Sequence, residues 1–384
     1  MKTYIIDGTR TPIGKFRGSL STIRTDDLAA HPIRSLMNRY PNLPMEMIDD
    51  VIFGCANQAG EDNRNIARMA LLLAGLPWTV PGETVNRLCA SGMSATIQAH
   101  RAVQAGDGHL FISGGVENMT RGPWVVSKSA RPFGSDAQMY GTHSMGQTAE
   151  NLAEKYNISR AEQDQFALWS QQKAADARDT GRLAQEITPI NIPQRKRDPI
   201  VFDTDEFIKD FTTLEGLSKL RAVFKAEGGS VTAGNASGLN DGAGALLVAS
   251  EKACSEYDLK PLARIVSSGV AGVEPRIMGI GPVYASQKAL DKAGLTLDQI
   301  DIIEINEAFS AQAIACFKQW GISLDDPRIN PNGGAIAIGH PLGMSGARIL
   351  HTAGLELRRR DKKYALVTMC VGVGQGYAVV LEAQ

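Results

Sequence analysis

The sequence predicts a layered α/β fold built from two similar halves, with an extra segment inserted into the first half. Three observations lead to this prediction. Apolar runs of strand length alternate with helical stretches of about 10–15 residues, which is typical of helices packed on sheets. The chain shows internal similarity, and a stretch of different composition interrupts the first copy. The length of 384 residues suits two or three domains, or one large duplicated one.

The composition excludes several other classes of protein. With 43% hydrophobic and 21% charged residues, the chain is neither disordered, nor fibrous, nor a disulfide scaffold. The net charge of -1 argues against a dedicated nucleic-acid or membrane-surface binder. No uncharged apolar stretch reaches the length of about 18 residues that a bilayer span needs. Five widely spaced cysteines disfavour a structural zinc site and fit a reducing compartment, so we expect a cytoplasmic protein without a metal site.

The duplication is visible in paired segments. Residues 43–54 (LPMEMIDDVIFG) and 295–306 (LTLDQIDIIEIN) each read as a short helix, then Ile-Asp, then a strand. The tetrapeptide GMSA at 92–95 resembles GMSG at 343–346, and the first glycine follows the Ile-Asp isoleucine by 44 residues in one copy and 43 in the other. Because order and spacing repeat together, we infer two related halves.

The end of each copy shows where the insertion lies. Both copies continue with an apolar strand, at 110–115 and 364–372, and finish with one more strand, at 242–250 and 374–383. The last strand of the first copy comes about 130 residues later than the repeat would place it. The predicted parts are an N-terminal half (1–118 plus 241–251), an inserted domain (119–240) and a C-terminal half (252–384).

The inserted segment begins with amphipathic helical sequence and then becomes irregular. Ser159 is the expected N-cap of a helix, and Gly181 is its expected C-terminal stop.

Candidate catalytic residues follow predicted strands in both halves. Cys89 falls at a strand-to-helix turn among small residues, where the helix N-terminus would favour a thiolate. The alternative is a buried cysteine serving as a small apolar residue. His340 occupies the matching turn of the second half, either as a general base or as a turn histidine bonded to backbone.

Two further strand ends carry polar groups. Cys370 ends an apolar strand before the glycine loop that contains Gly372, and its alternative role is again that of a core cysteine. Asn306 follows a strand and opens a helix, so it either caps that helix or orients a water or carbonyl. A thiol with a nearby base forms thioesters, and a second thiol can move a carbon-bound proton.

With these residues in hand, the chain resembles the thiolase family essentially end to end. The motifs are NRLCASGMSA, GGVENM, VTAGNASGLNDGAGA, MGIGPV, NEAFSAQ, NPNGGAIAIGHPLGMSGAR and TMCVGVGQG. The resemblance implies two βαβαβαββ halves that form a layered α-β-α-β-α core with an inserted loop domain. It also implies thiolytic cleavage of a 3-ketoacyl-CoA to acetyl-CoA and a shortened acyl-CoA, and the reverse Claisen condensation.

The same resemblance implies a role for each candidate. Cys89 would carry the acyl group in a ping-pong mechanism, and His340 would deprotonate Cys89 or the sulfur of coenzyme A. Cys370 would exchange a proton with the α-carbon, and Asn306 would hold a water that forms an oxyanion hole with His340. The N–H groups of Cys89 and Gly372 would form a second hole.

The implied ligands are coenzyme A and acyl-CoA as substrates, with no permanently bound cofactor. Ser237 matches the family serine that contacts pantetheine, Lys209 falls where relatives carry a basic residue near the nucleotide, and Arg221 is a further phosphate candidate. For Lys209 and Arg221 the alternative is an ordinary solvated charge. The family also implies a homodimer or a dimer of dimers, and leaves open a complex with a hydratase/dehydrogenase subunit.

One departure bears on the substrate. Thiolases of the acetoacetyl-CoA type carry a histidine directly before the Met-Gly of the inserted domain, whereas here Ser144 stands there and His143 lies one position earlier. The segment between Gly115 and Met145 is also short. We therefore expect a degradative thiolase acting on a medium-chain or functionalised 3-ketoacyl-CoA, including the 3-oxoadipyl-CoA type, with an acetoacetyl-CoA thiolase as the alternative.

Three other classes of protein fit the sequence less well. A decarboxylating ketoacyl synthase shares the fold, but Cys370 in its glycine loop argues against it. A catalytically silent CoA- or lipid-binding homologue would lack Cys89 or His340, and both are present. A thiol redox protein would use a Cys89–Cys370 disulfide, although the chain has no closely spaced pair of cysteines.

Overall fold

The computed structural model describes residues 1–58, 60–123 and 144–384. Within these ranges the strands form a ten-stranded mixed sheet and a separate two-stranded hairpin. The sheet runs in the order β10-β11-β12-β9-β1-β8-β5-β3-β4, and β2 pairs with β8 beside this path.

The first half of the chain supplies one side of this sheet. Its elements are β1 (Thr3–Arg10), β2 (Gly14–Lys15), η1 (Ser19–Thr22), α1 (Thr25–Arg39), η2 (Met45–Met47), β3 (Asp50–Gly54), α2 (Ile66–Ala74), β4 (Gly82–Val85), α3 (Ser91–Ala105), β5 (Leu110–Asn118) and β8 (Asn240–Ser250). The strands β3, β4 and β5 are parallel, while β8 runs antiparallel between β5 and β1.

The second half repeats this pattern. Its elements are α8 (Glu251–Glu256), β9 (Ala263–Gly272), η4 (Pro275–Ile280), α9 (Gly281–Ala293), η5 (Leu297–Gln299), β10 (Ile302–Ile305), α10 (Ser310–Trp320), α11 (Ala335–Ile338), α12 (Leu342–Arg360), β11 (Tyr364–Val371) and β12 (Gln375–Ala383). With the short β2 left aside, the N-terminal half has five strands in the sheet. From β1 outward, their order is β1-β8-β5-β3-β4, that is, the first strand in the chain, the last, the fourth, the second and the third. The C-terminal half matches it, with its third strand reduced to a single bridge between Ile303 and Ile329.

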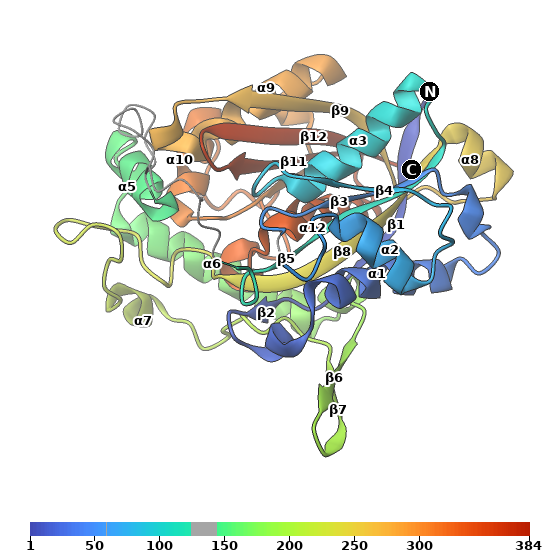
Figure 1. Cartoon of the computed structure of the whole chain (residues 1–384). Coiled ribbons are helices and arrows are strands. Elements are labelled where there is room, and N and C mark those ends of the chain that lie inside the picture. The colour runs from blue at the N-terminus through green and yellow to red at the C-terminus, as the bar shows by residue number, and fades with distance from the viewer. Residues whose placement is uncertain (59, 124–143) are drawn as a thin grey trace, which may run out of the picture.

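The predicted layering is confirmed. Two residue pairs, Tyr4–Arg264 and Ile5–Ala263, join β1 to β9, so the two halves of the sheet meet along a narrow seam. Helices α3 and α12 pack against each other and lie between the halves, since α12 contacts β5 and β8 on one side and β10, β11 and β12 on the other. Helices α1 and α2 cover the outer face of the first half, and α9 covers that of the second (Figure 1).

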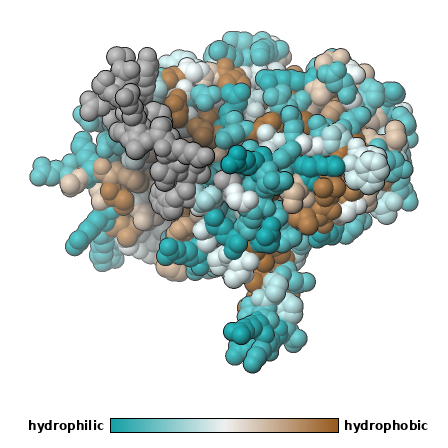
Figure 2. Space-filling model, viewed as in Figure 1, coloured by the Kyte–Doolittle hydropathy of each residue, from teal (hydrophilic) through white to brown (hydrophobic). Residues whose placement is uncertain are grey.

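The described part of the segment between β5 and β8 lies along one side of the molecule (Figure 1). It contains α5 (Met145–Lys155), α6 (Arg160–Asp179), η3 (Leu183–Gln185), β6 (Ile190–Gln194), β7 (Arg197–Phe202) and α7 (Leu214–Ser218). Ser159 caps α6 in a capping box and Gly181 takes a left-handed conformation just after its end, as the sequence predicted. The β6–β7 hairpin projects from the body (Figure 1), and its hydrophilic tip stands out in Figure 2.

Candidate active site

Helices α3 and α12 begin at the same point in the centre of the molecule. Glycines make this close approach possible: a Cβ on Gly92 would lie 2.5 Å from the carbonyl oxygen of Gly343, and one on Gly346 would lie 2.4 Å from the nitrogen of Met93. Because Cys89 and His340 each stand two residues before one of these helices, the crossing brings their turns together.

Cys89 is buried, with 9% of its surface exposed. Burial raises the pKa of its thiol to about 11, and the backbone N–H groups of Gly372 and of Cys89 itself, which point at the sulfur, offset only part of that rise. Burial therefore outweighs the two donors and favours the neutral thiol, and a thiolate stabilised by the helix N-terminus stays a prediction. The sulfur still lies against two backbone donors of the kind that stabilise an oxyanion.

His340 is buried and its hydrogen bonds define its tautomer. Ser345 Oγ lies 2.6 Å from His340 Nδ1 and donates its own proton to the carbonyl of Pro341 at 2.8 Å. A hydroxyl has one proton, so Nδ1 must donate to Ser345, which leaves the lone pair on Nε2. Burial, with a smaller contribution from the Arg348 charge, lowers the pKa of His340 to about 3. The imidazole is thus neutral, and Nε2 carries the lone pair that can accept a proton.

Asn306 is fully buried and contacts His340 directly. Its Nδ2 lies 3.3 Å from His340 Nε2, while its Oδ1 has no hydrogen-bond partner among the described residues. It does not cap the following helix, because α10 begins at Ser310 and its N-cap position is Phe309. Of the two roles open to Asn306 in the sequence, the capping role is therefore wrong.

Cys370 and Gly372, at the end of β11, are the last two members of the cluster that contains Cys89, His340 and Asn306. Cys370 is fully buried, and its pKa is raised well above the usual range by burial and further by the nearby Cys89 sulfur. Gly372 lies beside Leu88 and Met145, since a Cβ there would be 3.1 Å from Leu88 Cδ1 and 3.7 Å from Met145 Sδ. The five predicted catalytic residues thus converge from α3, β10, β11 and α12.

Three further residues support this cluster and were missed by the sequence reasoning. Ser345 orients the imidazole, and Asn240 accepts the backbone N–H of His340 at 3.0 Å through Oδ1. Glu117 is buried at the end of β5, where its carboxylate accepts the N–H groups of Ala56, Asn57 and Gly343 at 2.9–3.0 Å. Glu117 and Asn240 lie in the motifs GGVENM and GNASGLND, whose polar residues at strand ends were the available signal.

The predicted coenzyme A residues are only partly brought together. Lys209 lines a cavity of about 290 Å³ on the inserted segment, together with Phe207, Phe211, Gly234 and Ile336. Within the described chain, Ser237 and Arg221 are not among the lining residues of this cavity. Ser237 is half-buried and its backbone N–H donates to the carbonyl of Ala308, close to Asn306, whereas Arg221 is exposed.

The residue directly before Met145-Gly146, which bears on the type of substrate, is a serine that caps a helix. Ser144 is the N-cap of α5, and its hydroxyl accepts the N–H of Gln147. His143 and the short segment before it lie outside the described residues.

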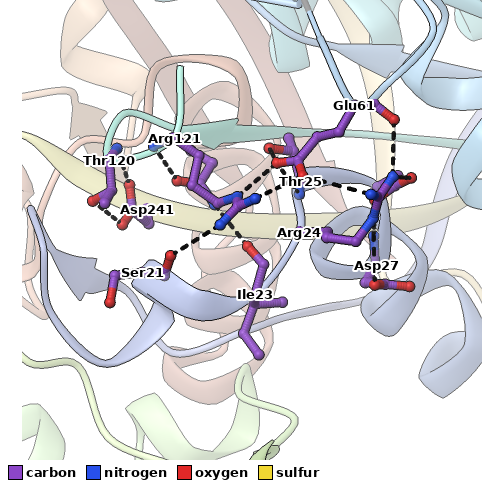
Figure 3. Close-up of polar contacts among 11 residues, drawn as sticks. Ser21, Ile23, Arg24, Thr25, Asp27, Glu61, Thr120, Arg121 and Asp241 are labelled. Atoms are coloured by element: carbon purple, nitrogen blue, oxygen red, sulfur yellow. Dashed lines mark hydrogen bonds and ion pairs between the residues drawn. The ribbon is translucent and has the colours of Figure 1, made fainter. Parts of the chain in front are cut away.

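Figure 3 shows how the chain is held where it leaves β5. Arg121 forms two hydrogen bonds with the Glu61 carboxylate, at 2.7 and 2.9 Å, and Glu61 also accepts from Thr25. Thr120 donates its N–H to Asp241 Oδ1 at 2.9 Å, which ties the exit of β5 to β8. The exit of β5 is thus tied to α1 through Glu61 and to β8 through Asp241.

Comparison with known proteins identifies this architecture. Residues 3–252 match the family model described as the thiolase N-terminal domain, and residues 259–383 match the thiolase C-terminal domain. The chain belongs to the thiolase family.

Individual relatives agree with the family assignment. The chain is 54% identical to the beta-ketoadipyl-CoA thiolase of Acinetobacter baylyi over 396 residues, covering 99% of this chain and 98% of that protein. It is 54% identical to the 3-oxoadipyl-CoA/3-oxo-5,6-dehydrosuberyl-CoA thiolase of Escherichia coli, with 99% of both chains covered. The crystal structure of the Bacillus anthracis acetyl-CoA acetyltransferase superposes with a TM-score of 0.92 at 39% identity, covering 100% of this chain and 99% of the other.

These findings confirm the predicted fold and activity. The chain is an acyltransferase that cleaves a 3-ketoacyl-CoA with coenzyme A into acetyl-CoA and a shortened acyl-CoA. In the described residues, no helix is both long and apolar enough to cross a membrane.

Proposed function

We propose that the substrate is a 3-ketoacyl-CoA whose acyl chain ends in a carboxylate, of the 3-oxoadipyl-CoA type. Support comes from relatives at 54% identity that are named for this substrate, compared with 46% for an acetyl-CoA acetyltransferase from Chromobacterium violaceum. Ser144 also stands where thiolases of the acetoacetyl-CoA type carry a histidine. The second candidate, an acetoacetyl-CoA thiolase, is favoured by the close superposition on the acetyl-CoA acetyltransferase of Bacillus anthracis.

In the proposed first step, His340 Nε2 takes the thiol proton of Cys89 as the sulfur attacks the keto carbonyl. The N–H groups of Cys89 and Gly372 stabilise the resulting oxyanion, and each such donor is typically worth a few kcal/mol. The bond between the α-carbon and the former keto carbon then breaks. Acetyl-CoA leaves as an enolate, which Cys370 protonates, while Asn306 and His340 stabilise the enolate oxygen through a water.

In the second step, coenzyme A attacks the acyl group on Cys89. The Cys370 thiolate accepts the proton of the coenzyme A thiol, and the His340 imidazolium returns its proton to the Cys89 sulfur as that sulfur leaves. The shortened acyl-CoA is released, and both thiols and the neutral imidazole are regenerated. The direction of the two backbone donors toward the Cys89 sulfur is the observation that carries this mechanism. Ser237, Lys209 and Arg221 are the proposed contacts to coenzyme A.

We also propose the division into an N-terminal half (1–118 plus 241–251), an inserted domain (119–240) and a C-terminal half (252–384). The equivalent strand orders of the two halves support it. A homodimer or dimer of dimers is proposed for the assembly, with a hydratase/dehydrogenase subunit as a further partner to test. A cytoplasmic location is proposed because the five cysteines are free.

Intact-protein mass after mixing with a panel of 3-ketoacyl-CoAs tests the mechanism and the substrate together. With 3-oxoadipyl-CoA we expect a succinyl adduct that is absent from Cys89→Ala and is discharged by added coenzyme A. Cys254→Ala, which removes a free cysteine on α8, is the matched control and should still load. Preferred loading from acetoacetyl-CoA would support the second candidate, and no adduct from any substrate would support a silent homologue.

A further inference from the structure

A buried carboxylate beside the candidate site has no part in the mechanism given above. Glu307 follows Asn306 directly after β10, and only 1% of its surface is exposed. Burying a carboxylate is costly unless hydrogen bonds replace the water that it loses. The groups that supply those hydrogen bonds show what Glu307 holds together.

Three donors from separate parts of the chain hold this carboxylate. Ser170, on α6 of the inserted segment, donates its hydroxyl at 2.6 Å, and Ile336 donates its backbone N–H at 3.2 Å. Asn330 donates Nδ2 at 2.6 Å, and its orientation is fixed because its Oδ1 accepts the N–H of Ile305. These hydrogen bonds oppose the rise in the pKa of Glu307 that burial causes. Since all three partners donate, they fit the ionised carboxylate.

The same contacts fix the segment that leads into His340. Ile336 lies in the first turn of α11, which ends two residues before His340. Gly334, directly before α11, donates its N–H to Ser170 Oγ at 3.1 Å. A Cβ on Gly334 would lie 2.2 Å from Glu307 Cδ, so the backbone passes directly over the carboxylate.

Glu307 therefore borders both members of the pair that would hold the enolate oxygen. Asn306 is its neighbour in the chain, and the helix that it holds leads to His340. The two side chains lie 3.3 Å apart, from Asn306 Nδ2 to His340 Nε2. A misplacement of about 1 Å in such a site can cost roughly 100-fold in rate, so the distance between these two atoms has to be fixed.

The duplicated frame itself does not require a carboxylate at this position. Residues 43–54 correspond to residues 295–306, so the residue equivalent to Glu307 is Cys55. Cys55 is fully buried in the hydrophobic core of the first half. Because the same strand end folds with a small apolar side chain in one half, the carboxylate of the other half serves its own surroundings.

We propose that Glu307 is a positioning residue for the enolate step. It sets the distance between Asn306 and His340, and it ties both to the inserted segment through Ser170. This inference rests on the proposed function, in which that pair stabilises the enolate oxygen through a water. Transfer of the acyl group between Cys89 and coenzyme A forms no enolate, so it should depend on Glu307 much less.

Two reactions of the same enzyme separate these steps. Thiolytic cleavage of 3-oxoadipyl-CoA passes through the enolate, whereas exchange of labelled coenzyme A into succinyl-CoA needs only the thioester at Cys89. In Glu307→Gln the amide turns an N–H toward a group that is itself a donor, so cleavage should fall about 100-fold. Exchange should keep most of its rate, because Ser345 and Asn240 still hold His340.

Three further variants complete the comparison. Asn306→Ala is the reference and should lose cleavage while it keeps exchange. Glu186→Gln alters another buried glutamate, whose carboxylate accepts from Arg10, and should leave the ratio of the two rates at the wild-type value. Ser170→Ala removes the donor from the inserted segment, so it should give a smaller loss of cleavage alone. It replaces Glu307→Gln if that variant does not fold.

Equal losses of cleavage and exchange in Glu307→Gln, or no loss of either, would overturn the proposal. So would a crystal structure of this variant in which the Asn306–His340 distance stays at 3.3 Å. If Asn306→Ala loses both reactions equally, the proposed role of Asn306 fails, and the crystal structure still tests Glu307. If the wild type cleaves acetoacetyl-CoA instead, the proposed substrate fails, and the same comparison is made with acetoacetyl-CoA cleavage and acetyl-CoA exchange.

Discussion

Burial shifts the pKa values of Cys89 and His340, the two central residues of the candidate site, so that both side chains are neutral. Burial raises the pKa of Cys89 to about 11 and lowers that of His340 to about 3. A thiol with the higher pKa cannot transfer its proton to an imidazole with the lower one at rest. In the proposed mechanism the proton therefore moves as the sulfur attacks, when the N–H groups of Cys89 and Gly372 stabilise the developing oxyanion.

This arrangement predicts a Cys89 thiol that stays protonated at neutral pH. The thiolate should appear only as the pH rises toward about 11, because the pKa is raised and the neutral form is favoured below it. The measurement is the ultraviolet absorbance of the thiolate during a pH titration, taken as the difference between wild type and Cys89→Ala. A midpoint below the ordinary thiol pKa of about 8.5 would show a resting thiolate–imidazolium pair instead.

At the scale of elements, the sequence predicted the order of helices and strands well because local signals were strong. Ser159 and its glutamate three positions on form a capping box, and the paired Ile-Asp segments both become a 3-10 turn followed by a strand. The residues alone left open whether Asn306 caps the following helix or serves the site, and only the family resemblance implied that it lies beside His340. Nor could the sequence show that Ser345 fixes the imidazole, since both contacts depend on how the turn that carries His340 folds and packs against the end of β10 within the C-terminal half.

The crossing of α3 and α12 depends on the absence of a side chain at Gly346. A Cβ there would lie 2.4 Å from the backbone nitrogen of Met93, and a backbone atom cannot move aside cheaply. Gly346→Ala should therefore separate the helices, destabilise the fold by about 2 kcal/mol and lower kcat by displacing Cys89 from His340. Denaturant unfolding and steady-state thiolysis measure the two effects.

Gly354→Ala is the control within the same helix. A Cβ at Gly354 meets the flexible side chain of Leu262 at 3.0 Å, so this variant should keep its activity. Equal losses in the two variants would show that any added methyl in α12 is harmful, and that the crossing has no special role.

At the scale of the whole molecule, the sheet ends in an edge that lacks a partner strand among the described residues. Strand β4 pairs with β3 alone, and exposed apolar side chains lie close to it in sequence: Leu72, Leu73 and Trp78, the last with 78% of its surface exposed. An open strand edge beside exposed apolar side chains invites pairing with another chain. A second copy meeting this edge would continue the sheet between subunits, in agreement with the proposed homodimer.

Trp78→Asp should therefore shift the protein toward monomers, because a desolvated carboxylate at the centre of an apolar contact is costly. Sedimentation velocity over a range of protein concentrations measures the shift. Val201→Asp, which places the same charge on an exposed apolar residue of the β6–β7 hairpin, should leave the dimer intact. If Trp78→Asp stays dimeric and Val201→Asp does not, the hairpin forms the interface in place of the β4 edge.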